Sequence, residues 1–514
     1  MEERRASDEV FLPGCETERT GSVVREKERK LRLREVDRRQ MVLHPVDIDR
    51  LIPEDHEARA IWELVGSLDL SSYYETIGSV EGEAGAPAFD PHLLISLWVY
   101  AYSKGVGSAR EIARLCEYDP AYQWLTGIRP VNYHTLADFR GTHEKSLRTL
   151  FIEVLALLTN EGLITMERVM HDGTRIKAHA GRDTFRSEEA IREHVKRAES
   201  QVKAMEASDE EMTARMRKAR ERAVKERKER LAHALDELAK IRCQKRSASE
   251  RVSMTDPDCR IMGQADGGYA PSYNVQISTD AHEKAIVSVS VAQSPADQTL
   301  LPSALSHIET TMGRLPDQLV VDAGFTTKEA ILASEEKGVD LVGSLSDNTA
   351  LRKANLRQWG IDETFWPERF SYDEENDCYT CPEGKVLAYK DRRIERGKTT
   401  FFYKGKDCKN CPSKPLCCPR TPKGRTVSRT ENDPRVKAFI EKMETPEAKV
   451  VYRQRGEVAE FPNAWIKARF GLRQFHLRGI VKAGIEALWA CLTYNIKLWI
   501  RLSWRSRLRA GMER

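Results

Sequence analysis

Residues 319–325 read Leu-Val-Val-Asp-Ala-Gly-Phe, an apolar run that ends in an acid, Asp322. Such a run is typical of a buried strand in an α/β sheet, where functional residues follow the carboxyl ends of strands. A similar segment occurs earlier: residues 169–174 read Val-Met-His-Asp-Gly-Thr, so that an apolar strand start meets Asp172 and then a glycine. An acid after an apolar strand is common, and 79 of the 514 residues are acidic, so neither segment is informative alone.

A third acid, Glu460, lies in a helical stretch among basic and aromatic residues. The spacing of this stretch is Tyr452-x2-Arg455-x4-Glu460-x6-Lys467. Asp172, Asp322 and Glu460 thus come from two strand ends and one helix. Three such carboxylates can hold two divalent metal ions, the arrangement that cuts and joins phosphodiesters. Glu457, three residues before Glu460, is the alternative third acid.

The segments around these acids predict a mixed α/β sheet with helices on both faces. We expect strands at 273–278, 285–292, 319–321 and 339–345, and helices at about 297–311 and 327–337. Residues 166–178 predict a strand pair that turns at Asp172. The resulting domain is expected to comprise residues 163–346 and 431–514.

A charged helical insertion is predicted at 182–252. Ile191, Val195, Ala198, Val202 and Met205 keep a heptad-like spacing, and a capping box at Ser208-x2-Glu211 marks a break and a restart. The pattern favours an antiparallel helical hairpin. Between residues 215 and 230, nine basic residues stand against three acidic ones; this face either contacts DNA or, as we favour, is a solvated coiled-coil face.

The N-terminal part predicts a flexible charged arm at 1–45 and an all-helical domain at 46–162. Asp90-Pro91 and Asp119-Pro120 are helix starts, and Ser108 with Glu111 forms a capping box. Short helices separated by glycine turns are typical of a helix-turn-helix-like DNA-binding domain. An ordinary helical bundle is the alternative.

Six of the eleven cysteines fall between Cys378 and Cys418, which predicts a Cys-rich insertion at 347–430. Two CxxC pairs at this separation indicate a structural zinc ribbon, because four thiolates complete a tetrahedral site. The best ligand set is Cys381, Cys408, Cys411 and Cys417, with Cys378 or Cys418 as substitutes. Unligated thiols are the alternative.

The C-terminal region is basic, with eleven Lys or Arg against two acids from 463 to 514. Lys467, Arg469, Arg473 and Arg478 form a candidate phosphate-binding face just after Glu460. Residues 489–502 have apolar positions on helical spacing and are expected in the core.

Composition indicates a soluble, intracellular protein. The net charge is only +4, so any affinity for nucleic acid depends on local basic patches. There is no run of 18 apolar residues, and the N-terminus is too charged for a signal peptide, so no membrane partner is expected.

Taken in order, these motifs resemble the DDE-type transposases of bacterial insertion sequences, over nearly the whole chain from about Val36. His171–Thr174 resembles the first catalytic motif and Asp322–Phe325 the second, while Arg455–Lys467 resembles the Tyr-Arg-Glu-Lys signature, although one residue longer between Arg and Glu. Residues 51–56 resemble the opening of the N-terminal domain. Asp256-Pro257 and residues 267–274 resemble the approach to the second core strand.

The resemblance implies a ribonuclease H-like fold in which Asp172, Asp322 and Glu460 bind two Mg²⁺ or Mn²⁺ ions. It also implies that Tyr452, Arg455 and Lys467 contact DNA, although Tyr452 in the core and a solvated Lys467 are the alternatives. The expected partners are double-stranded DNA, at element ends and target, and at least one further copy of the chain. The expected location is cytoplasmic and nucleoid-associated. Two other functions stay open: a transposase-derived DNA-binding protein without catalysis, and a metal-dependent nuclease.

Overall fold

The computed structural model describes residues 45–79, 87–206, 214–245, 250–345, 349–395 and 398–512. The charged arm at 1–45 and the capping box at Ser208 therefore lie outside the described residues, Pro45 excepted. The chain divides into two units, residues 1–46 and 47–514, and the architecture below is that of the second.

The N-terminal region is helical, as predicted. Its elements are η1 (Ile48–Leu51), α1 (Glu57–Ser67), α2 (Ser71–Tyr74), α3 (Pro91–Ser103), α4 (Ala109–Tyr118), α5 (Pro120–Thr126), α6 (Tyr133–Thr142) and α7 (Glu144–Asn160). The predicted caps are confirmed: Asp90, Ser108 and Asp119 each accept a backbone N–H of the first helical turn. Gly127 ends α5 in the left-handed conformation that a helix C-terminus often requires.

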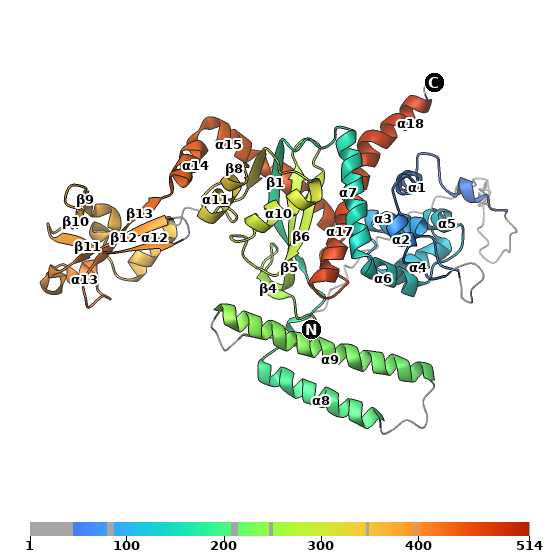
Figure 1. Ribbon diagram of the computed structural model, residues 1–514, viewed down its shortest axis with the longest axis horizontal. Coiled ribbons are helices and arrows are strands. Elements are labelled where there is room, and N and C mark those ends of the chain that lie inside the picture. The colour runs from blue at the N-terminus through green and yellow to red at the C-terminus, as the bar shows by residue number, and fades with distance from the viewer. Residues whose placement is uncertain are drawn as a thin grey trace, which may run out of the picture. The chain divides into compact units, whose positions relative to one another are not determined.

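A six-stranded mixed sheet lies at the centre of the unit (Figure 1). Its strands are β1 (Arg168–Lys177), β4 (Arg260–Gly263), β5 (Tyr269–Asp280), β6 (Ile286–Ala292), β7 (Gln318–Val321) and β8 (Asp340–Val342). The order is β4-β5-β1-β7-β8, with β6 also paired to β5. Strands β1, β7 and β8 are parallel, and β5 runs antiparallel to β1, β4 and β6. The predicted mixed α/β class is thus confirmed.

The prediction of a strand pair that turns at Asp172 is wrong. β1 is one continuous strand, and Asp172 and Gly173 lie in its middle, paired with Ile277 and Gln276 of β5. Gly173 is not a turn residue. A Cβ at this position would lie 2.7 Å from Gln276 Nε2 and 2.9 Å from Asp297 Oδ1. A glycine is therefore needed here, because it leaves room for these two side chains against the backbone of β1.

Helices cover both faces of this sheet. On one face Met170, Val320 and Val342 pack with Val458 and Ala459 of α16 (Arg455–Ala468). Side chains alternate along a strand, so the neighbouring residues of β1, β7 and β8 point the other way. Those residues belong to the main core together with α10 (Leu301–Met312) and α11 (Lys328–Glu336).

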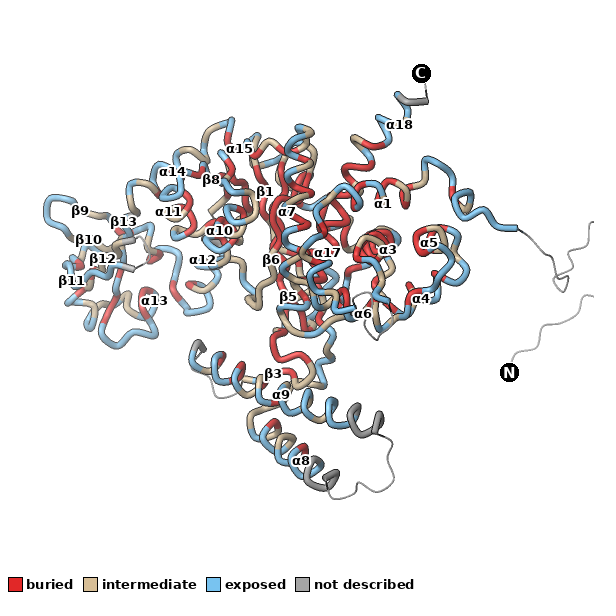
Figure 2. Tube along the Cα trace, turned by 45° about the vertical axis from the view of Figure 1, so that its right-hand side comes forward, coloured by how far each residue is buried: buried red, intermediate tan, exposed pale blue. Residues whose placement is uncertain are grey.

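The C-terminal helices are α14 (Pro434–Glu444), α15 (Pro446–Arg453), α16, α17 (Ile480–Trp499), the π-helix η6 (Ile500–Trp504) and α18 (Arg505–Met512). α17 is buried along nearly its whole length and packs against α3, α7 and β6, as the red tube of Figure 2 shows. Asn495 of α17 exchanges two hydrogen bonds with the backbone of Ile286, at 2.9 and 2.8 Å. This helix therefore belongs to the cores of both the sheet and the N-terminal helices.

The charged insertion forms α8 (Glu188–Glu206) and α9 (Ala214–Lys245), which pack together as the predicted hairpin (Figure 1). Ile191, Val195 and Ala198 lie in their shared apolar core. Strands β2 (Phe185–Arg186) and β3 (Val252–Ser253) pair at the base of the hairpin.

The Cys-rich region forms a five-stranded antiparallel sheet in the order β13-β12-β11-β10-β9. Its elements are α12 (Thr349–Gln358), η3 (Glu363–Phe365), η4 (Pro367–Arg369), β9 (Ser371–Asp373), β10 (Cys378–Thr380), β11 (Val386–Glu395), β12 (Lys398–Gly405), η5 (Asp407–Asn410), α13 (Lys414–Cys417) and β13 (Thr426–Asn432). Within the described ranges, no helix has the length and apolar character needed to cross a membrane.

Candidate active site

The first two predicted acids become neighbours through strand register. β1 and β7 are parallel, and their last pair is His171 with Val321. Asp172 and Asp322 therefore occupy the next position on each chain, where β7 ends and β1 continues. Parallel register places both carboxyl groups at the same edge of the sheet, the one at which the parallel strands have their carboxyl ends.

The loop after β7 fixes the Asp322 carboxylate. The N–H groups of Gly324 and Phe325 donate to its Oδ1 at 2.7 and 3.2 Å, closing a turn over the acid. The Phe325 ring packs edge-on against the buried imidazole of His171, with ring centroids 4.8 Å apart. The local motif thus anchors the acid to the strand beside it.

A cleft of about 430 Å³ opens at this edge. It is lined by acids and bases together: Asp172, Asp266, Asp297 and Asp322 with Arg175, Lys177, Lys467 and Arg473. Of the predicted site residues, the cleft gathers Asp172, Asp322, Lys467 and Arg473. The sequence interpretation missed Asp297, Arg175, Lys177 and Asp266, which carried no motif signal.

Burial raises the pKa of the Asp172 carboxyl to about 6. The Gly173 N–H, which donates to Oδ1 at 2.8 Å, and the Arg455 guanidinium oppose this rise. The negative charges of Asp322 and Asp297 add to it. Three acids and one arginine therefore act on one another in a poorly solvated site.

Lys467 reaches the same cleft from α16. Burial lowers the pKa of its ammonium group, and the nearby Asp172 carboxylate opposes that shift. On the same helix, Asn463 donates from Nδ2 to Asp172 Oδ2 at 3.3 Å. Asn463 is only 7% exposed, and its Oδ1 has no hydrogen-bond partner among the described residues.

Glu460, the third predicted acid, does not line the cleft. Its side chain is 67% exposed, with its carboxylate 3.9 Å from the Arg455 guanidinium. It nevertheless shares a helical face with Asn463 and Lys467, three and seven residues further on. The alternative acid, Glu457, lies elsewhere and forms an ion pair with Lys284 at 2.9 Å.

The remaining predicted DNA-binding residues are dispersed. Tyr452 lines a separate hollow with Phe439 and Met443. Arg469 lies over the Trp465 ring at 5.6 Å. Arg478 is exposed.

The cysteines do not form the predicted tetrahedral set. Among the described residues, no three thiols have sulfurs within 4.8 Å of one another. Cys417 and Cys418 lie in the apolar core of the Cys-rich sheet, with Cys381 packed against it. Burial raises the pKa of the Cys417 thiol to about 12, with Cys418 and Cys408 acting in the same direction.

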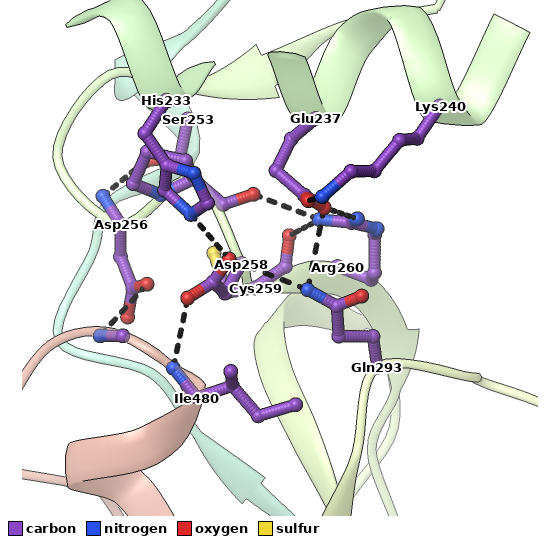
Figure 3. Close-up of polar contacts among 12 residues, drawn as sticks. His233, Glu237, Lys240, Ser253, Asp256, Asp258, Cys259, Arg260, Gln293 and Ile480 are labelled. Atoms are coloured by element: carbon purple, nitrogen blue, oxygen red, sulfur yellow. Dashed lines mark hydrogen bonds and ion pairs between the residues drawn. The ribbon is translucent and has the colours of Figure 1, made fainter. Parts of the chain in front are cut away.

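One group in the described part of the chain does meet the distance criterion for a metal site. His233 and Glu237 of α9 and Asp258 have potential ligand atoms within 4.8 Å of one another (Figure 3). The Glu237 carboxylate, however, already contacts Lys240 at 2.7 Å and Arg260 at 2.5 Å, and His233 Nε2 lies 2.7 Å from Asp258. These cations offset the acids, so the group acts foremost as an ion-pair network that fastens α9 to the sheet.

Comparisons with known proteins agree with the motifs. The family model for a transposase domain (DUF772) matches residues 46–142, and the model for a transposase DDE domain matches residues 380–499. The curated proteins include no match. Among solved structures, a cryo-EM structure of the piggyBac transposase synaptic complex with hairpin DNA is similar at a TM-score of 0.26 and 10% identity. That alignment covers 89% of this chain and 84% of that chain, but so low a score supports no inference about fold or function.

Two separate segments thus match transposase family models, and these matches support a DNA transposase. Both matches are consistent with the DDE type found in insertion sequences. Enzymes of this type use divalent metal ions.

Proposed function

We propose that the chain binds the inverted-repeat ends of an insertion sequence and catalyses metal-dependent DNA cleavage and strand transfer. The observation that carries the proposal is the cleft where β7 ends beside β1. It joins Asp172 and Asp322 to Lys467 of the helix that also carries Glu460.

By donor type the residues of the site fit hard divalent cations, and since no three of its acids have ligand atoms within 4.8 Å of one another among the described residues, the ions would have to draw them together. Every acidic donor is a carboxylate oxygen, the ligand that Mg²⁺ and Mn²⁺ prefer. Asn463 of α16 donates from its amide nitrogen to Asp172 Oδ2 and so helps to position that carboxylate. Asp172, Asp322 and Glu460 would hold two ions, which supply activation of a water or 3′-hydroxyl and stabilise the leaving oxygen.

The protein residues supply position and charge. The exposed Glu460 side chain can turn toward the cleft once Arg455 finds another anion, and a DNA phosphate is such an anion. Lys467 and Arg473 offer cations to the backbone of a strand lying in the cleft. We assign Tyr452, Arg469 and Arg478 to flanking DNA on the basis of the signature and their basic surroundings.

The finer architecture belongs to the same proposal. The strand order β5-β1-β7-β8, with β1, β7 and β8 parallel, supports a ribonuclease H-like catalytic domain at 163–346 and 431–514. We assign DNA binding to the helical domain at 46–162. The Cys-rich insertion at 347–430 would hold one zinc ion through Cys381, Cys408, Cys411 and Cys417 after local rearrangement. Joining two element ends requires at least a dimer on DNA.

A plasmid assay tests the activity. Supercoiled DNA carrying candidate inverted repeats is incubated with the protein and Mn²⁺, and joined products are expected. Nicks without joining would indicate a nuclease, and a gel shift without cleavage a DNA-binding protein. Strand transfer that survives Asp322→Ala would refute the assigned metal site.

The third acid has a matched control on its own helix. We expect Glu460→Gln to abolish strand transfer, because a metal ligand is lost. Glu457→Gln should change the rate by less than about threefold, since it breaks only an exposed ion pair with Lys284. The reverse ranking would reassign the catalytic acid to Glu457.

A further inference from the structure

The last helical segment carries a row of arginines that the proposed site does not use. The π-helix η6 and α18 continue α17 toward the C-terminus, with helical backbone angles at both junctions (Figure 1). Arg501, Arg505 and Arg509 follow one another at a spacing of four, which is close to one turn of either helix type. Their side chains therefore lie on one face of the helix, and we call this row the arginine stripe.

The other sides of the same helix are fixed to the protein. Ser503 and Arg507, two positions from the stripe residue between them and so on the opposite side, both bind the Glu161 carboxylate. Trp504 is only 6% exposed and donates from Nε1 to Glu63 at 2.8 Å. These contacts determine how the helix is turned about its axis. The stripe consequently faces away from the protein, and its three side chains are exposed.

The arginines of the stripe lack the acidic partners that the neighbouring cations have. Arg507 forms an ion pair with Glu161, and Lys497, one turn before Arg501, forms one with Glu57. Within the described part of the chain, no hydrogen bond or ion pair engages any of the three stripe guanidinium groups. Three like charges in a row, with no acid to offset them, create a positive local potential that attracts an extended anion.

The stripe begins beside the helix that carries Glu460. Arg501 and Arg505 line a hollow of about 200 Å³. Phe461 and Trp465 line the same hollow from α16, and Phe461 directly follows Glu460 in the sequence. The stripe therefore starts on the flank of α16, next to the residue proposed as the third metal ligand.

We propose that the arginine stripe binds the phosphate backbone of double-stranded DNA. The helical rise of 1.5 Å per residue sets successive arginines about 6 Å apart along the axis, close to two base-pair steps of about 3.4 Å. A guanidinium group is suited to phosphate because it donates two parallel hydrogen bonds to one anion. Such contacts carry no sequence information, so the stripe holds DNA without reading the inverted repeat. The inference rests on the proposed function, because it takes DNA as the substrate.

The salt dependence of DNA binding tests the inference. The affinity of the full-length protein for two duplexes of equal length, a candidate inverted-repeat end and a scrambled sequence, is measured by fluorescence anisotropy in EDTA at a series of salt concentrations. The slope of log K against log salt concentration reports the number of neutralised phosphates, at about 0.9 for each. The triple variant Arg501→Gln, Arg505→Gln, Arg509→Gln should reduce this slope by about 2 to 3, equally for both duplexes.

The control is Arg507→Gln, which removes the same charge from the opposite side of the same helix. Because Glu161 engages Arg507, its loss should leave the slope unchanged, whatever its effect on the melting temperature. Replacing the three stripe residues with lysine keeps their charges and should recover most of the slope. Should the triple glutamine variant lose its fold, the three single variants are measured, each with an expected reduction of about one.

Three results would overturn the inference. The first is an unchanged slope in the glutamine variants. The second is a reduction in Arg507→Gln as large as that in Arg505→Gln. The third is a reduction confined to the inverted-repeat duplex, which would indicate recognition of bases. If the triple variant loses self-association in sedimentation while its slope is unchanged, the stripe binds a second copy of the chain, and the inference is likewise refuted.

The same measurements separate this inference from the proposed function. If the wild type binds both duplexes and the stripe variants keep its slope, only the role of the stripe is refuted. If the slope falls as expected but Mn²⁺ supports no strand transfer, the stripe stands as a DNA-binding surface and the proposed catalysis falls. If the wild type binds neither duplex, both proposals fall.

Discussion

Replacing Asp172 with asparagine should make the metal-free protein more stable at neutral pH. Burial, and to a smaller extent the charges of Asp322 and Asp297, raise the pKa of this carboxyl from 3.8 to about 6. A group whose pKa is raised by folding stabilises the folded state only at low pH. Its contribution is complete below the unfolded pKa and is lost as pH rises through about 6.

The size of the effect follows from that shift. A rise of about two pKa units means that the ionised carboxyl destabilises the folded state by at most about 3 kcal/mol at pH 7.5. At pH 5 this destabilisation is about half as large. Asp172→Asn removes the ionisable group, so the free energy of unfolding of the variant should exceed that of the wild type by up to these amounts. The new amide oxygen can still accept from the Gly173 N–H, and the new amide nitrogen can donate to Asn463 once the Asn463 amide turns over to present Oδ1 in place of Nδ2.

Urea unfolding in EDTA at pH 7.5 and pH 5, followed by tryptophan fluorescence, measures the difference. Asp266→Asn is the control: its side chain is 74% exposed, so it should stay within about 0.5 kcal/mol of the wild type at both pH values. An Asp172→Asn variant less stable than the wild type at pH 7.5, or a gain that does not shrink at pH 5, would refute the reasoning.

Three further outcomes are expected. Gly173→Ala should destabilise the protein by about 1–3 kcal/mol in the same urea assay, because the new Cβ would lie within 3 Å of Gln276, Asn274 and Asp297. Gly484→Ala on α17, with nothing within 4 Å, should be neutral or stabilising by up to about 1 kcal/mol, and equal losses would contradict the contact argument. Elemental analysis should find one zinc per chain, lost in Cys408→Ser and Cys411→Ser but kept in Cys243→Ser, whose thiol is exposed; a zinc-free wild type would rule out the ribbon. Asp258→Ala should cost about 1–2 kcal/mol by thermal unfolding, because Oδ2 caps the Ile480 N–H at 2.9 Å, whereas the exposed Asp236→Ala should cost nothing measurable.

The sequence predicts correctly those helices and strands that are determined by residues close to one another in the chain. Asp90, Ser108 and Asp119 cap helices through hydrogen bonds to residues two or three positions away, so the capping pattern can be recognised from the sequence. The strand before Asp322 could be predicted in the same way, because its short apolar run shows no helical spacing of apolar residues.

The misjudged positions depend on partners distant in the chain. The sequence predicts a turn at Asp172, but the strand continues, and the atoms that require a glycine at the next position belong to Gln276, Asn274 and Asp297, more than a hundred residues later. Asp297 itself was assigned to the start of a helix, which begins instead at Leu301. An aspartate before a helix suggests a cap, and only the packed sheet shows that this one turns toward other acids.

The burial of α17 has a consequence for biosynthesis. α3 and α7 near the N-terminus both pack on this helix, which is translated roughly 380 residues after α3. At a synthesis rate of roughly 5–20 residues per second, the apolar face of α3 remains without α17 for about 20–75 s after α3 is made. During that interval the nascent chain offers chaperones and proteases an exposed hydrophobic surface. Ribosomes that stop before α17 would release chains whose main core is incomplete, so synthesis of α17 decides which copies can mature.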